Sequence, residues 1–223
     1  HQYRLTPEGR NTENVLLTIG IPTHDRGNLV LKRLQNLLKM QYDAEIEIAI
    51  SKNGTTLYQE EYEEVGRISD ARINYYDHGR ELRPEMNWHY VMQMAHGKYV
   101  LLVSDEDDVE MEALEHYLKL ISTHPEANVI RAKSNFFYRD IQERIHKKGG
   151  LDAFGSAFLR QNYLSGMILC RENYLQENFE KLGRFSDNIF YNRYPHEWWC
   201  AILCMKGCLL YTSPSPRDKR QSR

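Results

Sequence analysis

Short apolar segments alternate with segments of helical periodicity along the first half of the chain. Continuous apolar runs of strand length are typical of a sheet that helices cover on both faces. Four strand–helix repeats therefore predict an α/β fold with a mainly parallel sheet. The predicted strands are residues 15–21, 45–51, 72–76 and 98–104. The predicted helices begin near Asn28, which is a candidate helix cap, and near Tyr58, Pro84 and Met111.

The second half has a looser, mixed pattern. It predicts strands within residues 129–138 and 163–169, and a helix at residues 196–205. Trp198 and Trp199 lie in that helix and favour core packing. We expect residues 1–207 to form one domain, divided into halves at about 15–125 and 126–207.

The last residues differ from the rest of the chain. Residues 208–223 are polar, contain two closely spaced prolines and resemble the conceptual translation of a sequencing-library adapter. The alternative is a native, disordered Ser/Pro tail. Either way, we expect few packing contacts from Cys208 onward, and a natural chain that continues beyond Gly207. The chain starts at His1 without a signal-peptide core, which predicts a trimmed or fragmentary beginning.

Composition limits the classes of partner and the compartment. The chain carries 29 Lys and Arg against 31 Asp and Glu, so no basic excess points to a nucleic acid polymer. No apolar run approaches the roughly 20 residues of a membrane-spanning helix. Outside the tail, the cysteines are Cys170, Cys200 and Cys204, an odd, scattered set that favours buried free thiols and a reducing, cytoplasmic location.

Four consecutive acidic residues, Asp105 to Asp108, follow the fourth predicted strand. Ligands of open α/β sheets bind outside the carboxyl ends of strands. Crowded carboxylates there favour a hard divalent cation such as Mg²⁺ or Mn²⁺. The alternative is a helix start enriched in acids, which the helix dipole favours. That alternative accounts for Asp107 and Asp108 better than for Asp105.

Three ordered sequence blocks resemble family-two glycosyltransferases of the GT-A fold. The blocks are residues 17–26 (LTIGIPTHDR), residues 50–55 (ISKNGT), and Asn87 followed by residues 95–107 (AHGKYVLLVSDED). The resemblance implies a Rossmann-like nucleotide-binding half at about 15–125 and an acceptor half at about 126–207. It also implies inverting transfer of a sugar from a nucleotide-sugar donor, such as a UDP-, GDP- or dTDP-sugar, to a glycan or lipid-linked acceptor. A role in polysaccharide assembly, at the inner face of a membrane, is a further implication.

Carried over by motif, the resemblance assigns roles to individual residues. The first two loops and the D-x-D element would bind the donor through Pro22, Thr23, Arg26, Asn53 and Asp105. Asp105 and Asp107 would hold the metal. Glu197 would be the general base that deprotonates the acceptor hydroxyl, and Asp187 is the next candidate. Asn87 favours a bridging role within the fold.

The chain departs from the family pattern at three positions. Lys52 stands where the family usually has an aspartate that helps to read the base, which leaves the base open. Met86 replaces a usual arginine, whose charge Arg80 or Arg83 could supply, and Asp108 is an extra acid. Two other functions stay open: a haloacid-dehalogenase-like phosphatase with Asp105 as nucleophile and Asp107 as acid, and a non-catalytic sugar-nucleotide binder.

Overall fold

The computed structural model describes residues 4–5, 12–41, 46–132, 145–157, 163–179, 181–182 and 187–212. The chain divides into two compact units, residues 1–109 and 110–223. The division falls at Val109, so the helix that we expected to close the first half belongs to the second unit. Among the described residues, no helix is both long enough and apolar enough to cross a membrane.

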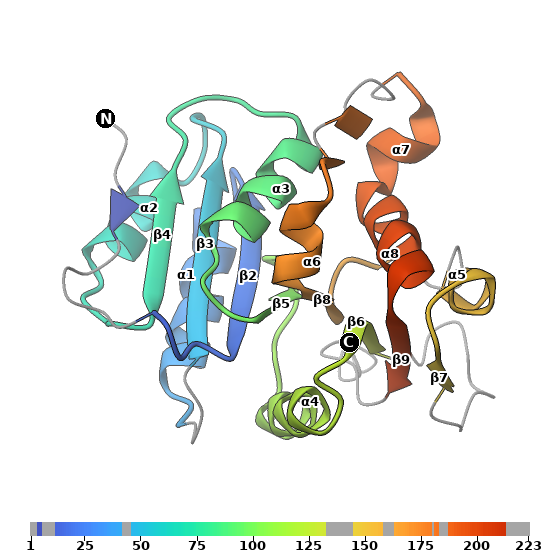
Figure 1. The fold of residues 1–223 in the computed structure, drawn as a ribbon. Helices are drawn as coiled ribbons and strands as arrows, with labels where there is room; N and C mark the ends of the chain where they lie inside the picture. Colours follow the sequence, from blue (N-terminus) through green and yellow to red (C-terminus); the bar gives the residue numbers. More distant parts are fainter. Residues whose placement is uncertain are drawn as a thin grey trace, which may run out of the picture. The chain divides into compact units, whose positions relative to one another are not determined.

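The first unit is a sheet covered by helices on both faces. Its strands lie in the order β1-β4-β3-β2-β5, with β2 to β5 parallel and β1 antiparallel to β4. Helices α1 and α2 lie on one face and α3 on the other (Figure 1). The strands are β1 (Arg4–Leu5), β2 (Leu17–His24), β3 (Ile46–Asn53), β4 (Ile73–Asp77) and β5 (Tyr99–Leu102). The helices are α1 (Gly27–Leu38), α2 (Gln59–Arg67) and α3 (Pro84–Met94).

Burial explains this arrangement. Every residue of β3, and every residue of β2 except the last, is buried, as expected for central strands that helices cover on both faces. Helix α1 places Val30, Leu34 and Leu37 against the sheet at helical spacing. The α/β fold with a mainly parallel sheet is therefore confirmed.

Several predicted boundaries in the first unit were wrong. Strand β2 continues through Pro22 to His24, because β5 pairs only with Leu17–Gly20 and leaves one side of the proline outside a ladder. Helix α1 begins at Gly27 with Arg26 at its N-cap position, so Asn28 is not the cap. Strand β5 ends at Leu102, two residues before the predicted end.

The second unit contains a small mixed sheet in the order β8-β6-β9-β7. The pairs β6–β8 and β7–β9 are antiparallel, and β6–β9 is parallel. The strands are β6 (Ala127–Ala132), β7 (Ile145–Lys147), β8 (Met167–Cys170) and β9 (Cys208–Thr212). The helices are α4 (Met111–Thr123), α5 (Leu151–Ala157), α6 (Arg171–Gln176), α7 (Ile189–Arg193) and α8 (Pro195–Lys206).

An aromatic cluster forms part of the core of this unit. The rings of Tyr174 and Trp199 lie edge to face with centroids 5.2 Å apart, and Phe179 packs beside them. The predicted helix at 196–205 and the core position of Trp199 are thus confirmed. The strand predicted at 163–169 is wrong at its start, since β8 begins at Met167, after a turn with Gly166 at φ +88°. Residues 133–138 of another predicted strand lie outside the described residues.

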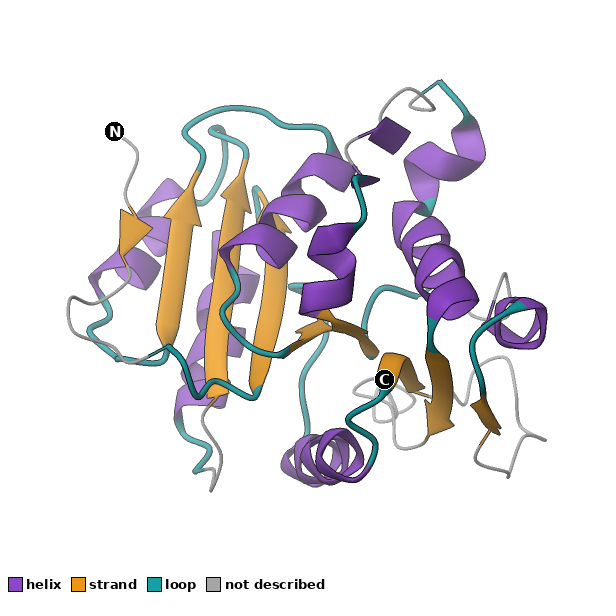
Figure 2. Ribbon diagram, viewed as in Figure 1, coloured by secondary structure: helices purple, strands orange, loops and turns teal. Residues whose placement is uncertain are grey.

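Strand β9 corrects our expectation for the end of the chain. Residues Cys208–Thr212 follow α8 after Gly207 and pair with β6 on one side and β7 on the other (Figure 2). Leu209 is fully buried. The prediction of few packing contacts is wrong for these five residues, and the rest of the tail lies outside the described residues. Cys170, Cys200, Cys204 and Cys208 are buried free thiols.

Candidate functional site

The predicted donor-binding residues lie at one edge of the first sheet. Strands β2, β3 and β5 run parallel, so the segments that follow them emerge at the same edge. Pro22 and Thr23 lie at the end of β2, and Asn53 ends β3 beside His24. Asp105 follows β5 after Val103 and Ser104. The structure therefore brings together the residues that the sequence motifs singled out in this unit.

Asp105 is a buried acid of this edge with a direct positive partner. Asp105 is 4% exposed, and Arg26 donates from Nη1 to Oδ1 of Asp105 at 3.1 Å. Arg26 also pairs with the carboxylate of Glu106. Burial raises the pKa of Asp105, while a hydrogen bond from Thr23 and the charge of Arg26 oppose that rise. Arg26 is therefore a partner of the acidic segment and not only a solvated loop charge.

A tyrosine that the sequence analysis missed organises the same contacts. The hydroxyl of Tyr62, on α2, lies 2.7 Å from Thr23 Oγ1 and accepts the backbone N–H of Arg26 at 2.9 Å. Thr23 has a single hydroxyl proton, so when it donates that proton to Asp105, the Tyr62 hydroxyl is the donor to Thr23. Burial raises the pKa of Tyr62 to about 12, so the phenol stays protonated at neutral pH. Tyr62 and Val65 are spaced as buried residues on one face of a helix, so the sequence indicated only core packing for Tyr62.

The other acids are held by α1. Arg33 donates from Nη1 to Asp108 at 2.5 Å and from Nη2 to the Glu106 carbonyl at 2.9 Å. Asp108, the extra acid, is thus a tether to α1. Asp107 is 5% exposed and borders a small cavity against α1 together with Arg33. Arg26 and Arg33 therefore neutralise much of the negative charge that we expected a divalent cation to neutralise.

The acidic segment still has a donor set that fits a divalent cation. In the part of the chain that the structure describes, no three His, Cys, Asp or Glu side chains gather into a metal cluster. Mg²⁺, however, is usually bound by one or two carboxylates together with substrate phosphates. Asp105 and Asp107 supply two such carboxylates, and an ion there would share Asp105 with Arg26.

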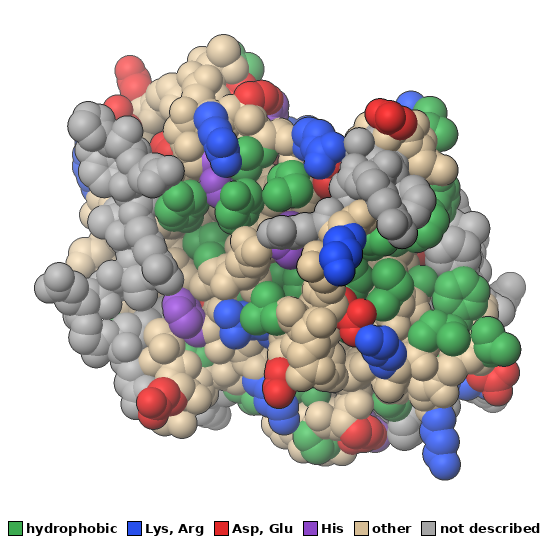
Figure 3. Space-filling view, turned by 45° about the horizontal axis from the view of Figure 1, so that its top comes forward, with side chains coloured by type: hydrophobic (Ala, Val, Ile, Leu, Met, Phe, Trp, Pro, Cys, Tyr) green, Lys and Arg blue, Asp and Glu red, His purple; other side chains and the backbone are tan. Residues whose placement is uncertain are grey.

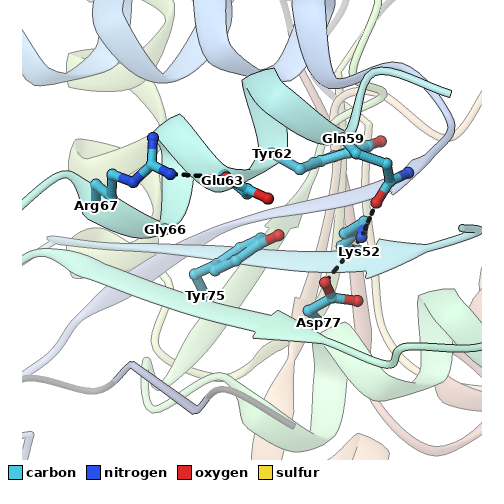
Figure 4. Close-up of a pocket in the computed structure, with 8 residues that line it drawn as sticks. All are labelled: Lys52, Gln59, Tyr62, Glu63, Gly66, Arg67, Tyr75 and Asp77. Atoms are coloured by element: carbon cyan, nitrogen blue, oxygen red, sulfur yellow. Dashed lines mark hydrogen bonds and ion pairs between the residues drawn. The ribbon is translucent and has the colours of Figure 1, made fainter. Parts of the chain in front are cut away.

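Asn53 and Lys52 have local partners in the structure. The Asn53 side chain both donates to and accepts from the backbone of Leu82, at 2.9 and 2.6 Å, and so fixes the segment that leads into α3. Lys52 is 4% exposed and donates from Nζ to Asp77 and to Gln59, both at 2.8 Å. Lys52, Gln59 and Asp77 form part of the wall of a cavity of about 580 Å³ beneath α2, which Tyr62 and Tyr75 also line (Figure 4).

Asn87 forms a buried bridge, as we expected. Its amide donates to the Thr23 carbonyl at 3.1 Å, and its Oδ1 accepts from Ser51 at 2.7 Å. The Ser51 oxygen in turn lies 2.9 Å from Nε2 of His78, which must be the donor. Burial, followed by the charge of Arg80, lowers the pKa of His78 to about 4. Asn87 thus joins β2, β3 and α3, and the neutral His78, which follows β4, donates to Ser51.

The candidate bases lie in the second unit and have different surroundings. Glu197 is in the first turn of α8, is fully buried and accepts from Arg131 Nη1 at 2.8 Å. Arg131 is itself 1% exposed, and nothing in its position on β6 marked it as a partner of Glu197. Asp187 is exposed, immediately before Asn188, which caps α7.

The charged surface is mixed. On the face that Figure 3 shows, the described Lys and Arg side chains are interspersed with Asp and Glu side chains. The described side chains on this face therefore do not make a broad positive field.

Solved structures with a similar fold include S. aureus TarS and a mannosyltransferase. The chain is 13% identical to S. aureus TarS 1-349, with a TM-score of 0.60. The match covers 88% of this chain and 58% of the TarS chain. It is 14% identical to the mannosyltransferase PcManGT from Pyrobaculum calidifontis, determined with GDP-Man and Mn²⁺, with a TM-score of 0.62. That match covers 89% of this chain and 54% of the PcManGT chain. The chain thus spans between half and two thirds of the length of these two neighbours.

Comparison with protein families gives the assignment. A search of curated proteins found no significant sequence match. The family model described as glycosyl transferase family 2 matches residues 18–197, which include every residue of the edge described above and Glu197. The chain therefore belongs to glycosyltransferase family 2.

Proposed function

We propose that this protein transfers a sugar from a nucleoside-diphosphate sugar to a hydroxyl of a glycan or lipid-linked acceptor, with inversion. The observation that carries the proposal is the buried Asp105, held by Arg26 and Thr23 at the carboxyl edge of a family 2 sheet. Two neighbours support the donor class. S. aureus TarS 1-349 has been solved with UDP and with UDP-GlcNAc, and PcManGT with GDP-Man.

The residues of the edge would bind the donor in complementary ways. Pro22, Thr23 and Asn53 would border the nucleoside, and Arg26 would bind the diphosphate, since a guanidinium matches phosphate oxygens in a fork geometry. Asp105 and Asp107 would hold Mg²⁺ or Mn²⁺, and the Mn²⁺ in the PcManGT complex supports this assignment. When bound, the ion neutralises charge on the departing diphosphate.

The transfer also needs a base. The acceptor oxygen bonds to the anomeric carbon as the bond to the diphosphate breaks, and the acceptor proton passes to a carboxylate. The base must lie across the sugar from the diphosphate, so Asp105 and Asp107 cannot serve. We propose Glu197 for this role. Arg131 donates to its Oε1 at 2.8 Å, which orients the carboxylate.

The products of a donor panel test the proposal. Incubation with UDP-, GDP- and dTDP-sugars, with mixed glycan and lipid-linked acceptors and Mn²⁺, should release a nucleoside diphosphate. Release of inorganic phosphate would indicate the phosphatase alternative, which places a nucleophile at Asp105. Binding of donor without either product would indicate a sugar-nucleotide binder.

Activity at the cytoplasmic face of a membrane, in polysaccharide assembly, is the setting that we propose for this reaction.

A further inference from the structure

Two residues other than glycine have left-handed backbone conformations in the described part of the first unit. They are Asp25, with φ 48°, and Tyr58, with φ 57°. Asp25 lies between β2 and α1, and Tyr58 lies between β3 and α2. Aspartate tolerates this conformation, but for a bulky tyrosine it is an outlier. Such strain persists only where surrounding contacts over-determine the backbone, and it concentrates at functional sites.

The carboxylate of Asp25 holds the two residues that precede Tyr58. Its Oδ1 accepts the backbone N–H groups of Thr56 and Leu57, each at 3.2 Å, and its Oδ2 pairs with the Thr56 hydroxyl. Burial raises the pKa of Asp25, but the bonds from Thr56 and Leu57 outweigh this and lower the pKa overall. Gly54, at φ +90°, approaches so closely that a Cβ there would lie 2.6 Å from Asp25 Oδ1.

A second close approach locks the same two loops. A Cβ on Gly27 would lie 2.5 Å from the carbonyl oxygen of Tyr58, so the start of α1 lies directly against the strained residue. Helix α2 begins at the next residue, Gln59. One turn further, Tyr62 bonds to Thr23 and to the backbone N–H of Arg26. The position of Tyr62 therefore depends on the segment that Asp25 holds.

We propose that Asp25 is a positioning residue for donor binding. By fixing residues 56–58, it sets the start of α2 and thereby the place of the Tyr62 hydroxyl, which orients Thr23 and Arg26 toward Asp105. The inference rests on the proposed function, because it assigns the donor's diphosphate to Arg26. Its effect passes through other residues, so it should change donor affinity more than the rate of transfer.

Four proteins test the proposal: wild type, Asp25→Ala, Asp25→Asn and the control Asp70→Ala. Asp70 also accepts a backbone N–H, that of Arg72 at 2.8 Å, but at the amino end of β4. Calorimetric titration with UDP and with GDP measures affinity, and urea unfolding measures stability. We expect Asp25→Ala to bind about tenfold more weakly, which is about 1.4 kcal/mol. Asp25→Asn should stay within about threefold of wild type, because asparagine adopts the same backbone conformation and keeps an acceptor for both amides.

Each other outcome is decisive. Wild-type affinity in Asp25→Ala would overturn the proposal, as would an equal loss in Asp70→Ala, which would show general destabilisation. An equal loss in Asp25→Asn would point to direct contact with the ligand instead of positioning. If Asp25→Ala does not fold, Thr56→Val removes one of the three bonds and should weaken binding by about threefold; unchanged affinity would overturn the proposal. If wild type binds neither nucleotide, the proposed function fails, and this inference falls with it.

Discussion

Arg26 and Asp105, which are 79 residues apart in the sequence, are joined by a hydrogen bond of 3.1 Å between Nη1 and Oδ1. The bond links the segment after β2 to the segment after β5. Half of the Arg26 side chain remains exposed, whereas that of Asp105 is 5% exposed. The carboxylate is thus held from one side by a guanidinium that still reaches solvent, where an anionic ligand could meet it.

Arg26→Ala should weaken nucleoside diphosphate binding by roughly tenfold or more, since a hydrogen bond to a charged group contributes about 1.5–3 kcal/mol. It should also lower the free energy of unfolding, because Asp105 stays buried without its cation. Titration calorimetry and urea unfolding measure the two effects. Arg67→Ala is the control: Arg67 pairs with Glu63 on the exposed face of α2, and its loss should change either quantity by less than about 0.5 kcal/mol. Equal effects in both variants would remove Arg26 from the site.

Tyr62→Phe removes one oxygen that two groups share. The Arg26 N–H and the Thr23 hydroxyl each lose a partner, so unfolding should become easier by about 1–3 kcal/mol, and nucleotide affinity should fall as well. Tyr75→Phe is the matched control, since Tyr75 is a buried tyrosine of the neighbouring strand β4. Urea unfolding and UDP titration compare the two. If Tyr75→Phe costs as much in both assays, the hydroxyl of Tyr62 has no special part.

His78 should make stability depend on pH below neutrality. Its folded pKa, about 4, lies below the ordinary value of 6.5, so between these values the unfolded chain binds a proton that the folded chain does not. The contribution of neutral His78 to the free energy of unfolding is therefore complete above pH 6.5. It falls toward pH 4 by at most about 1.4 kcal/mol per pH unit. Urea unfolding from pH 7 to pH 5 should show this slope, and His78→Gln should reduce it. An NMR titration that found the His78 pKa near 6.5 would contradict the prediction.

The repeat of strands and helices in the first unit was predictable, because burial on both faces imposes continuous apolar strands and amphipathic helices. The gathering of Thr23, Arg26 and Asp105 was predictable for the same reason, since parallel strands end at one edge. The strand boundaries were less so. Nothing local showed that β2 would continue through Pro22, because that depends on where β5 stops pairing.

Other features depend on contacts that are distant in the sequence. Tyr62 looked like a core residue, and only the fold brings its hydroxyl to Thr23 and to the backbone of Arg26. The pairing of Arg131 with Glu197 spans 66 residues between a strand and a helix. Strand β9 lies where the sequence predicted a tail without packing, because its pairing with β6 and β7 depends on segments that are distant in the sequence.

Glu197→Gln should abolish sugar transfer and leave nucleotide affinity nearly intact, since it keeps the shape of the side chain and its acceptor for Arg131 but removes basicity. A positioned base typically contributes about a hundredfold to ten-thousandfold. Asp187→Asn is the comparison, because Asp187 is the other candidate and is exposed. Steady-state kinetics give kcat and donor KM for each variant. Wild-type turnover in Glu197→Gln, with turnover lost in Asp187→Asn, would transfer the role to Asp187.

The central claim is that the carboxyl edge around Asp105 binds a nucleoside diphosphate with a divalent cation. The most direct measurement is a thermal-shift titration of wild type and Asp107→Asn with UDP and with GDP, each with and without Mn²⁺. A ligand that binds only the folded state adds about 2.7 kcal/mol to its stability at a hundred times Kd. We predict that at least one nucleotide raises the melting temperature of wild type, that Mn²⁺ enlarges the shift, and that Asp107→Asn loses the enlargement while it stays folded. A folded wild-type protein whose melting temperature no nucleotide changes, with or without Mn²⁺, would contradict the claim.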